Sequence, residues 1–451
     1  MCPTRGGRVS VGCQKATPDG SATLPTMSRP TRLRQLLFGP LLLLWVGCAP
    51  KLPPPETSSP TPSAISIPSA AEVAQPKFDP QKYTTMNTAL NSFGQRLFTE
   101  VAKSHEGNLA VSPVGPFVLL ELLREGAEGE TKTELTKVLG GEDWTSAEAA
   151  NLVWVLNQSP SLSVAQKVFV DSSTAIRSEY LAAIDPGLTG NVEPVSFKAD
   201  NNDAQKRIAD WTTKQSGGLL ETKIPLREDT LCVLLSALLY QGAWFHEFEP
   251  TDTKDKTFTC IDGTEIQVPT MWLDYRELHY YRQGDVQAVA LPYEDDMEML
   301  LILPKKGSSP ADALSSFDFS APPEDGDIRV TLELPRFEIK TPELELTDAL
   351  KALGAGALVD GAELSRLLDS PEAPMMSVRT FQQTLVKVNE AGTVAAAVTE
   401  MYASPASTET PSDDLPKEIE LHFNHPFAFA LRHKPSRALV FLGAVERPDE
   451  S

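Results

Sequence analysis

The amino-acid sequence predicts a mixed α+β fold organised around a large central β-sheet. Three observations lead to this prediction. The stretch 231–240 is apolar at nearly every position, as expected of a strand covered on both faces. Between 84 and 103, apolar residues recur every three or four positions, which is the period of a helix. From 257 to 337, short alternating or apolar runs bounded by turn residues predict several further strands.

The composition is that of a folded, acidic protein. The chain has 451 residues, of which 41% are hydrophobic and 22% are charged, so we expect a sizeable core. The formal net charge of −21 argues against non-specific binding to nucleic acid or to anionic membrane surfaces, because both are themselves negative. We therefore expect no nucleic-acid partner.

The front of the chain divides into three segments. Residues 1–26 look like neither a signal nor a domain, so we predict that they are an extension upstream of a true start at Met27. Residues 27–47 combine a basic segment with an apolar core and precede Cys48, a pattern that resembles a bacterial lipoprotein signal peptide. Residues 48–80 are rich in Pro, Ser and Thr, which predicts an extended tether.

The lipoprotein resemblance implies that Cys48 carries a lipid. The protein would then be anchored to a bacterial membrane on its extracytoplasmic side, in the periplasm or at the cell surface. A plain signal peptide or a membrane span is the alternative, but the apolar run is short for a span.

The first half of the body predicts helices with defined ends. Ser112 is placed to cap a helix that starts at Pro113, because Ser is a preferred N-cap and Pro suits the first helical turn. Thr131 and Glu134 fit a capping box that opens another helix, which ends at Gly140.

The remaining elements are mainly strands. Asp262-Gly263 is a typical hairpin turn. A helix is predicted at 204–215, and a short one ends at Gly354. The predicted strands are 161–170, 231–240, 257–260, 265–268, 297–304, 328–337, 425–432 and 438–445.

Sequence motifs for catalysis and metal binding are missing. The sequence contains no GxSxG, HExxH or GxxxxGK[ST] motif and no GxGxxG after a strand. The five cysteines form no CxxC pair, so neither a disulfide framework nor a metal site is expected. His422 and His425 are close in sequence, but we interpret them as surface or packing residues. We predict that the protein is not an enzyme and uses no cofactor.

An unusual run of small residues extends from Lys387 to Thr399. As a β-strand it has small, uncharged side chains on both faces, so it could enter between two existing strands without burying a charge. Gly392 supplies a bend before it. The alternatives are a flexible loop or a short helix, since alanine is the best helix former, but the interleaved Val and Thr weaken the helical case.

The run 388–399 resembles the hinge of the reactive loop in the serpin family of protease inhibitors. The resemblance extends from about Asn91 to Pro448 and includes the Gln241–Trp244 signature. It implies one domain, residues 81–451, with a large central sheet, further sheets and about eight or nine surrounding helices. It also implies a reactive loop at about 390–416.

The resemblance assigns roles to individual residues. Counting from Gly392 by the family's usual spacing places the cleaved bond at Ala406–Ser407. Because the loop is longer than usual, Met401–Tyr402 remains an alternative. The implied hinge residues are Glu390, Gly392, Thr393, Ala395, Ala396, Ala397 and Thr399.

The sequence departs from the family where the sheet opens. Ser112, Ser236 and Gln382 correspond to a gate beneath the strands that part. Ser236 replaces a usual asparagine, Gln382 a usual histidine and Gly115 a usual serine. Buried polar groups need partners, so we expect Ser236 and Gln382 to pair with each other.

The resemblance implies a suicide-substrate inhibitor of serine endopeptidases, or of cysteine endopeptidases, that acts as a monomer. The loop would be cleaved, trap the protease as an acyl-enzyme and insert into the main sheet. The target would prefer small or apolar residues, because no Arg or Lys lies between Lys387 and Lys417. The alternative is a non-inhibitory surface binding protein of the same fold that is merely cleaved.

Overall fold

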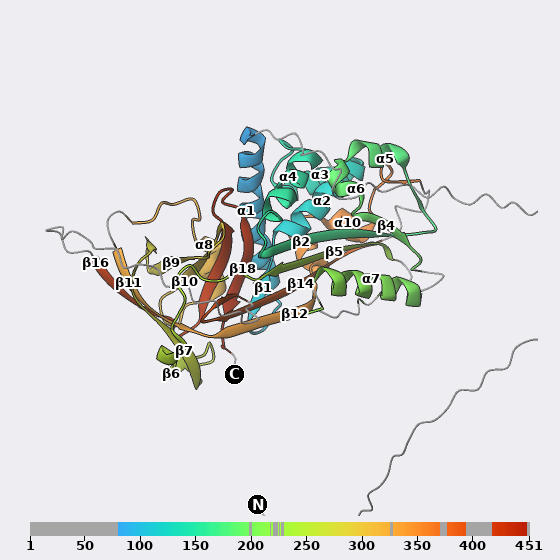
Figure 1. The fold of residues 1–451 in the computed structure, drawn as a ribbon. Coiled ribbons are helices and arrows are strands. Elements are labelled where there is room, and N and C mark those ends of the chain that lie inside the picture. Colours follow the sequence, from blue (N-terminus) through green and yellow to red (C-terminus); the bar gives the residue numbers. More distant parts are fainter. Residues whose placement is uncertain are drawn as a thin grey trace, which may run out of the picture. The chain divides into compact units, whose positions relative to one another are not determined.

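The computed structural model describes residues 80–197, 201–216, 218–219, 224, 226, 230–324, 328–369, 377–393 and 417–448. A mixed sheet organises this part of the chain (Figure 1). Its strands in spatial order are β12 (Phe337–Glu345), β14 (Ser377–Asn389), β5 (Thr230–Tyr240), β2 (Leu162–Asp171) and β4 (Val192–Val195), and the short β15 (Gly392–Thr393) pairs with β14. Within this sheet, β14 is parallel to β5 and β2 is parallel to β4, whereas the other neighbours are antiparallel.

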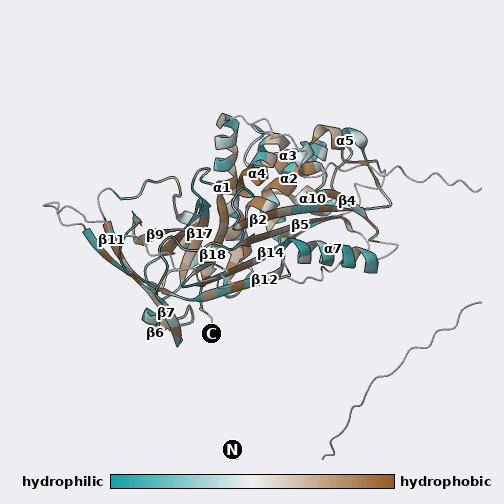
Figure 2. Ribbon diagram, in the orientation of Figure 1, coloured by the Kyte–Doolittle hydropathy of each residue, from teal (hydrophilic) through white to brown (hydrophobic). Residues whose placement is uncertain are grey.

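The two faces of the central sheet pack against different helices. Helix α2 (Val114–Gly126) lies on one face, and all its residues except Glu125 are buried. Helix α7 (Asn201–Gln215) lies on the other face, where Ile208 joins an apolar cluster with Leu235 and Phe381. Figure 2 shows the contrast between the apolar α2 and the largely hydrophilic α7. Because both faces are covered, β5 is apolar on both, which confirms the predicted strand.

Three further sheets complete the described β-structure. The strands predicted at 425–432 and 438–445 are confirmed as the antiparallel pair Phe427–His433 and Leu439–Val445. The Asp262-Gly263 turn joins the strands Lys254–Thr259 and Glu265–Glu277, with Gly263 at a φ of +82°. The six-stranded sheet has the order β1 (Leu109–Val111), β18 (Leu439–Val445), β17 (Phe427–His433), β10 (Met297–Leu303), β9 (Val286–Pro292) and β8 (His279–Gln283). The four-stranded sheet has the order β16 (Lys417–His422), β11 (Ile328–Pro335), β7 (Glu265–Glu277) and β6 (Lys254–Thr259), and β13 (Leu368–Asp369) pairs with β3 (Ala175–Ile176).

The prediction of one strand over 328–337 was wrong. The chain leaves the four-stranded sheet at Pro335 and enters the central sheet at Phe337. Arg336 lies between the two strands, and its backbone N–H donates to the Pro269 carbonyl at 2.9 Å. The backbone changes sheets without a turn, so no turn residue marks the boundary in the sequence.

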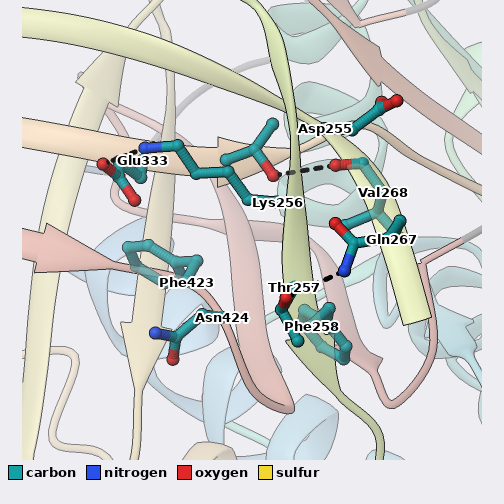
Figure 3. Close-up of a pocket in the computed structure, with 10 residues that line it drawn as sticks. Asp255, Lys256, Thr257, Phe258, Gln267, Val268, Glu333, Phe423 and Asn424 are labelled. Atoms are coloured by element: carbon teal, nitrogen blue, oxygen red, sulfur yellow. Dashed lines mark hydrogen bonds and ion pairs between the residues drawn. The ribbon is translucent and has the colours of Figure 1, made fainter. Parts of the chain in front are cut away.

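A pocket of about 350 Å³ opens beside β6 and β7 (Figure 3). Two of its polar pairs are already satisfied: Lys256 is paired with Glu333, and Gln267 Nε2 donates to Thr257 Oγ1 at 2.9 Å. The buried Phe423 also lines the pocket. We assign no ligand to it.

The described residues contain ten α-helices, compared with about eight or nine expected. The difference lies in single turns, because α6 and α10 have only four and five residues. None of the helices in the described ranges is long and apolar enough to cross a membrane. Besides α2 and α7, the helices are α1 (Pro80–Ala102), α3 (Gly129–Leu139), α4 (Ser146–Leu156), α5 (Ser178–Ala183), α6 (Pro186–Thr189), α8 (Pro310–Ser316), α9 (Thr347–Ala352) and α10 (Gly356–Asp360), with a 3₁₀ turn at Pro250–Asp252.

Two predicted helix caps were wrong. The N-cap of α2 is Pro113, and the Ser112 side chain makes no capping bond. Helix α3 starts before Thr131, whose Oγ1 accepts from the Glu363 N–H at 2.9 Å, while Glu134 accepts from the Ala357 N–H at 2.7 Å. These two side chains thus hold a distant segment instead of their own helix end. Gly140 ends α3 as predicted, with a φ of +90°.

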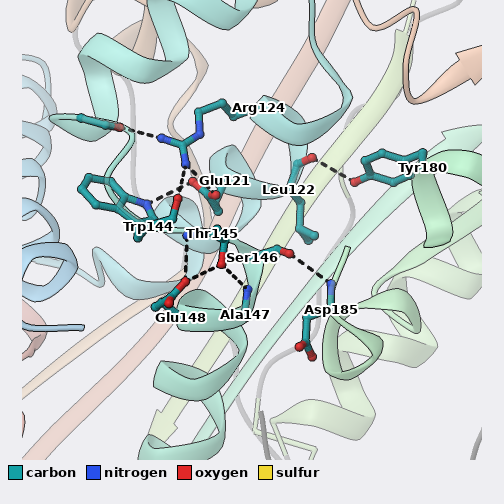
Figure 4. A network of polar contacts seen from close by, with 11 residues as sticks. Glu121, Leu122, Arg124, Trp144, Thr145, Ser146, Ala147, Glu148, Tyr180 and Asp185 are labelled. Atoms are coloured by element: carbon teal, nitrogen blue, oxygen red, sulfur yellow. Dashed lines mark hydrogen bonds and ion pairs between the residues drawn. The ribbon is translucent and has the colours of Figure 1, made fainter. Parts of the chain in front are cut away.

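A buried ion pair within α2 is hydrogen-bonded to the segment before α4 (Figure 4). Arg124 Nη2 donates to Glu121 Oε1 at 2.8 Å, and Trp144 Nε1 donates to Glu121 Oε2 at 3.2 Å. Arg124 also donates to the Gly141 carbonyl at 2.6 Å. Burial raises the pKa of Glu121 to about 7, although Arg124 and the hydrogen bonds act to lower it.

Replacing Glu121 with glutamine should flatten the pH dependence of stability. The pKa of Glu121 is higher in the folded chain than the ordinary value of 4.5, so its contribution is complete below pH 4.5 and is lost as the pH rises through about 7. Over that interval, wild type should lose roughly 2–3 kcal/mol of unfolding free energy relative to the variant. Urea unfolding at a series of pH values measures this, with the exposed Glu130→Gln as the control. If the unfolding free energies of wild type and Glu121→Gln change equally with pH, this role of Glu121 is contradicted.

Candidate functional site

The chain reverses direction where β14 ends. Asn389 Oδ1 accepts from the N–H groups of Ala391 and Gly392, at 3.1 and 3.3 Å, and so holds a tight turn. Strand β15 then runs back along β14, with Thr393 opposite Val388. The small-residue run predicted from the sequence therefore begins next to the strand that precedes it.

The other side of β15 contacts the segment that follows β5. Thr393 N–H donates to the Gly242 carbonyl at 2.8 Å, and Gly392 forms an antiparallel bridge with Ala243. Trp244 N–H donates to the Ala391 carbonyl at 3.0 Å. Two hinge residues therefore already lie between the end of β14 and the continuation of β5, antiparallel to both.

Only glycine fits at position 392. Its φ is +151°, and a Cβ atom there would lie 2.0 Å from the Gly242 carbonyl oxygen. Real Cβ atoms do not approach other atoms this closely, so any other residue would force the hinge away from Gly242. The bend predicted at Gly392 is thus also a point of close backbone contact.

Thr393 is fixed by a buried aromatic cluster. Its side chain is 2% exposed, and its Oγ1 forms a 2.5 Å hydrogen bond with the Tyr293 hydroxyl. Tyr293 stacks on Trp244 with ring centroids 4.2 Å apart, and Trp244 Nε1 donates to the Asn389 carbonyl at 2.9 Å. Burial raises the pKa of Tyr293, so the phenol stays neutral.

Glu390 ties the turn to the neighbouring strand. It is 8% exposed and accepts from Arg336 Nε at 2.8 Å and from Thr253 Oγ1 at 2.5 Å. Its carbonyl accepts from the Phe248 N–H at 3.0 Å. Burial acts to raise the pKa of Glu390, but the hydrogen bonds from Arg336 and Thr253 outweigh it and lower the pKa. The carboxylate is therefore charged and paired.

The gate residues meet beneath the seam between β14 and β5. Gln382 Oε1 accepts from the Ser112 N–H at 2.8 Å, and Gln382 Nε2 donates to the Ser112 carbonyl at 2.6 Å. The same Nε2 lies 3.4 Å from Ser236 Oγ, so the expected pairing of Ser236 with Gln382 is present but long. The strongest contacts of Gln382 are thus to the backbone of Ser112. That these residues control sheet opening stays a prediction.

Gly115 and Ser236 depart from the family pattern together. A Cβ atom on Gly115 would lie 2.3 Å from Ser236 Cβ, because α2 passes directly over β5 at this point. A serine at 115 would therefore collide with the serine at 236.

Sequence reasoning missed Tyr293, Arg336 and Thr253 as partners of the hinge. Tyr293 lies in the Leu291-Pro-Tyr293 segment, which carries no motif that marks a site residue. The three residues are between 54 and 137 positions from the hinge residues they bind, and no local pattern relates them. Their role emerges only from the fold.

Several predicted site residues lie outside the described residues. These are Cys48, Ala395, Ala396, Ala397, Thr399, Met401, Tyr402, Ala406 and Ser407. Within the described ranges, no group of three or more His, Cys, Asp or Glu side chains is placed to hold a metal ion. His425, one of the two neighbouring histidines, is buried and contacts the Pro304 carbonyl through Nε2 at 2.9 Å.

Comparison with known proteins agrees with this geometry. The family model described as serpin (serine protease inhibitor) matches residues 88–448. Serpin-Z2A of Triticum aestivum is 31% identical over 385 residues, covering 79% of this chain and 94% of that protein. Serpin B3 of Homo sapiens is 27% identical over 401 residues, covering 81% and 100%. The solved structure of Serpin48, described as a highly specific serpin in the insect Tenebrio molitor, has a TM-score of 0.69 and 25% identity, covering 83% of this chain and 100% of that one. The chain therefore belongs to the serpin family, whose members are generally protease inhibitors and not enzymes.

Proposed function

We propose that this serpin is a suicide-substrate inhibitor of serine or cysteine endopeptidases that prefer small or apolar residues. One observation carries the proposal. Gly392 and Thr393 already lie between the end of β14 and the segment after β5, hydrogen-bonded on both sides. The run of small residues follows these two residues directly in the sequence.

The chemistry follows from how such proteases act. The serine or cysteine nucleophile attacks the carbonyl of one loop bond, that bond breaks, and the new amine leaves on the downstream fragment. The upstream fragment stays attached as an acyl-enzyme. Water would complete hydrolysis, so inhibition requires the freed strand to enter the sheet before water attacks.

Insertion would improve the hydrogen bonding of the sheet. β14 and β5 are now parallel neighbours from Ser377 and Thr230 to Leu385 and Leu239. A strand that continues the direction of β15 would be antiparallel to both. Two antiparallel ladders would replace one parallel ladder, and antiparallel pairing is slightly more stable per residue.

The register of β15 indicates which residues would face the core. Val388 is opposite Thr393, so a continued register would place Ala395, Ala397 and Thr399 opposite Val386, Thr384 and Gln382. These three β14 residues are at most 2% exposed, so only small uncharged side chains would fit beside them. Thr399 would arrive beside Gln382, at the gate.

The cleaved bond that we propose is Ala406–Ser407, with Met401–Tyr402 as the second choice. The fourteen residues from Thr393 to Ala406 would span roughly 45 Å as a strand at about 3.3 Å per residue. That length would carry an attached protease from one end of the sheet towards the other. Small or apolar residues at both bonds support an elastase-like or chymotrypsin-like target.

A denaturing gel tests this function. The purified protein is mixed with elastase-like, subtilisin-like and chymotrypsin-like proteases. A covalent band of the combined mass with at least one of them is expected, and mass spectrometry of the released fragment identifies the bond. Cleavage of the loop without any such band would favour a non-inhibitory binding protein.

We also propose that the protein acts as a monomer held on the extracytoplasmic side of a bacterial membrane. The support is the basic segment and apolar core before Cys48, followed by the Pro/Ser/Thr-rich tether. A lipid on Cys48 would keep the domain near the membrane while leaving the loop accessible.

A further inference from the structure

The inner face of the central sheet carries a row of three polar residues. Cross-strand register places Gln382, Ser236 and Gln166 side by side on β14, β5 and β2. Directly opposite residues point to the same face of a sheet, so all three side chains face α2. They are 0, 2 and 3% exposed. The gate predicted from the sequence includes the first two but not Gln166.

The side chain of Gln166 has an unpaired hydrogen-bond donor. Gln382 uses its amide on the backbone of Ser112 and on Ser236. Gln166 Nε2 is buried and has no hydrogen-bond partner in the described part of the chain. A buried amide donor without a partner destabilises the folded state, and most such donors in proteins are paired.

Opening of the seam would change the partners of Ser236. A strand that enters between β14 and β5 moves them apart by about 4.8 Å, so the 3.4 Å contact between Gln382 and Ser236 breaks. β2 remains paired with β5 from Leu162 to Val170. Gln166 therefore stays opposite Ser236, with Cβ atoms about 5 Å apart, which is within reach of its amide.

We propose that Gln166 is a positioning residue for loop insertion. Its amide donates a hydrogen bond to the Ser236 hydroxyl once the hydrogen bond between Gln382 and Ser236 has broken. This inference rests on the proposed function. In the closed sheet the Gln166 Nε2 donor is unpaired, and in the open sheet it pairs with Ser236. Gln166 therefore lowers the free energy of opening in two ways. Its unpaired donor destabilises the closed sheet, and its hydrogen bond to Ser236 stabilises the open sheet.

The variant Gln166→Leu tests the proposal, because leucine fills similar volume without a donor. The probe is a synthetic peptide of residues 393–406, and the readout is the rate at which the protein becomes heat-stable as it takes up the peptide. We expect uptake to slow by at least about fivefold. The urea midpoint of the peptide-free variant should be unchanged or higher, whereas a purely structural role for Gln166 would lower it. Gln166→Asn keeps a donor opposite Ser236 and should restore most of the rate.

Two matched variants make the test specific. Gln383→Leu also removes a buried unpaired amide, but Gln383 lies opposite Ala237, which has no hydroxyl, so uptake should not slow. In a Ser236→Ala background, Gln166→Leu should have no further effect on the rate. Equal uptake by wild type and Gln166→Leu, or the same slowing in the Ser236→Ala background, would overturn the role of Gln166. If wild type itself takes up no peptide and gains no heat stability after loop cleavage, the proposed function fails as well.

Discussion

Replacing Thr393 with arginine should abolish trapping of a target protease while leaving cleavage of the loop intact. Thr393 is 2% exposed and lies between the Gly242 carbonyl and the Tyr293 hydroxyl. An arginine there must either bury its guanidinium or pull the hinge out of the sheet. The nearby Asp295 carboxylate already accepts from Tyr240 and Ser159.

The size of this effect follows from the cost of burying a charge. An unpaired buried charge costs several kcal/mol, and each 1.4 kcal/mol changes a rate about tenfold, so insertion should slow by at least about a hundredfold. Deacylation then occurs first, and the gel shows cleaved protein without a covalent band. Val394→Arg is the matched control, because a continued register would place this residue opposite Lys387, whose side chain is exposed. A Thr393→Arg protein that traps as much protease as wild type would rule out insertion through this face.

Replacing Gly115 with serine should cause the largest loss of stability among conservative changes at the gate. The added Cβ would lie 2.3 Å from Ser236 Cβ and 2.7 Å from Ser236 Oγ. Overpacking of this kind costs about 1–3 kcal/mol, occasionally more. Urea unfolding of the intact protein should show a lower midpoint and an unchanged slope.

The contact itself can be tested by removing its other partner. Adding Ser236→Gly should recover much of the stability lost in Gly115→Ser, although glycine in a strand has its own cost. Gly356→Ser is the control, because the nearest atoms to its Cβ are 4.0 Å away and it should lose little stability. If Ser236→Gly gives no recovery, the clash is not the cause of the loss.

Local patterns explain why much of the fold could be predicted. The β5 strand is apolar on both faces, and the β17–β18 hairpin consists of two apolar runs around a short turn, so each was recognisable on its own. The boundary at Arg336 was not, because an extended chain can change sheets without a turn. The Thr131 and Glu134 pair fits a capping box locally, but distant backbone N–H groups compete for both side chains.

The candidate site was predictable only in part. The resemblance to serpins indicated the hinge residues and the contact between Ser236 and Gln382. It did not indicate that Gly392 and Thr393 are already bound between β14 and the segment after β5, nor that Tyr293 holds Thr393. These contacts depend on long-range register, which the sequence of either partner alone does not encode. The coupling of Gly115 to Ser236 was missed for the same reason.

Thermal unfolding before and after loop cleavage tests the central claim, which is that the sheet can accept one more strand. The protein is nicked within residues 394–416, and its unfolding temperature is compared with that of the intact protein. We expect the nicked form to unfold more than about 10 °C higher, because a whole strand of new hydrogen bonds and buried side chains is added. A nicked form that unfolds at or below the temperature of the intact protein would contradict the account.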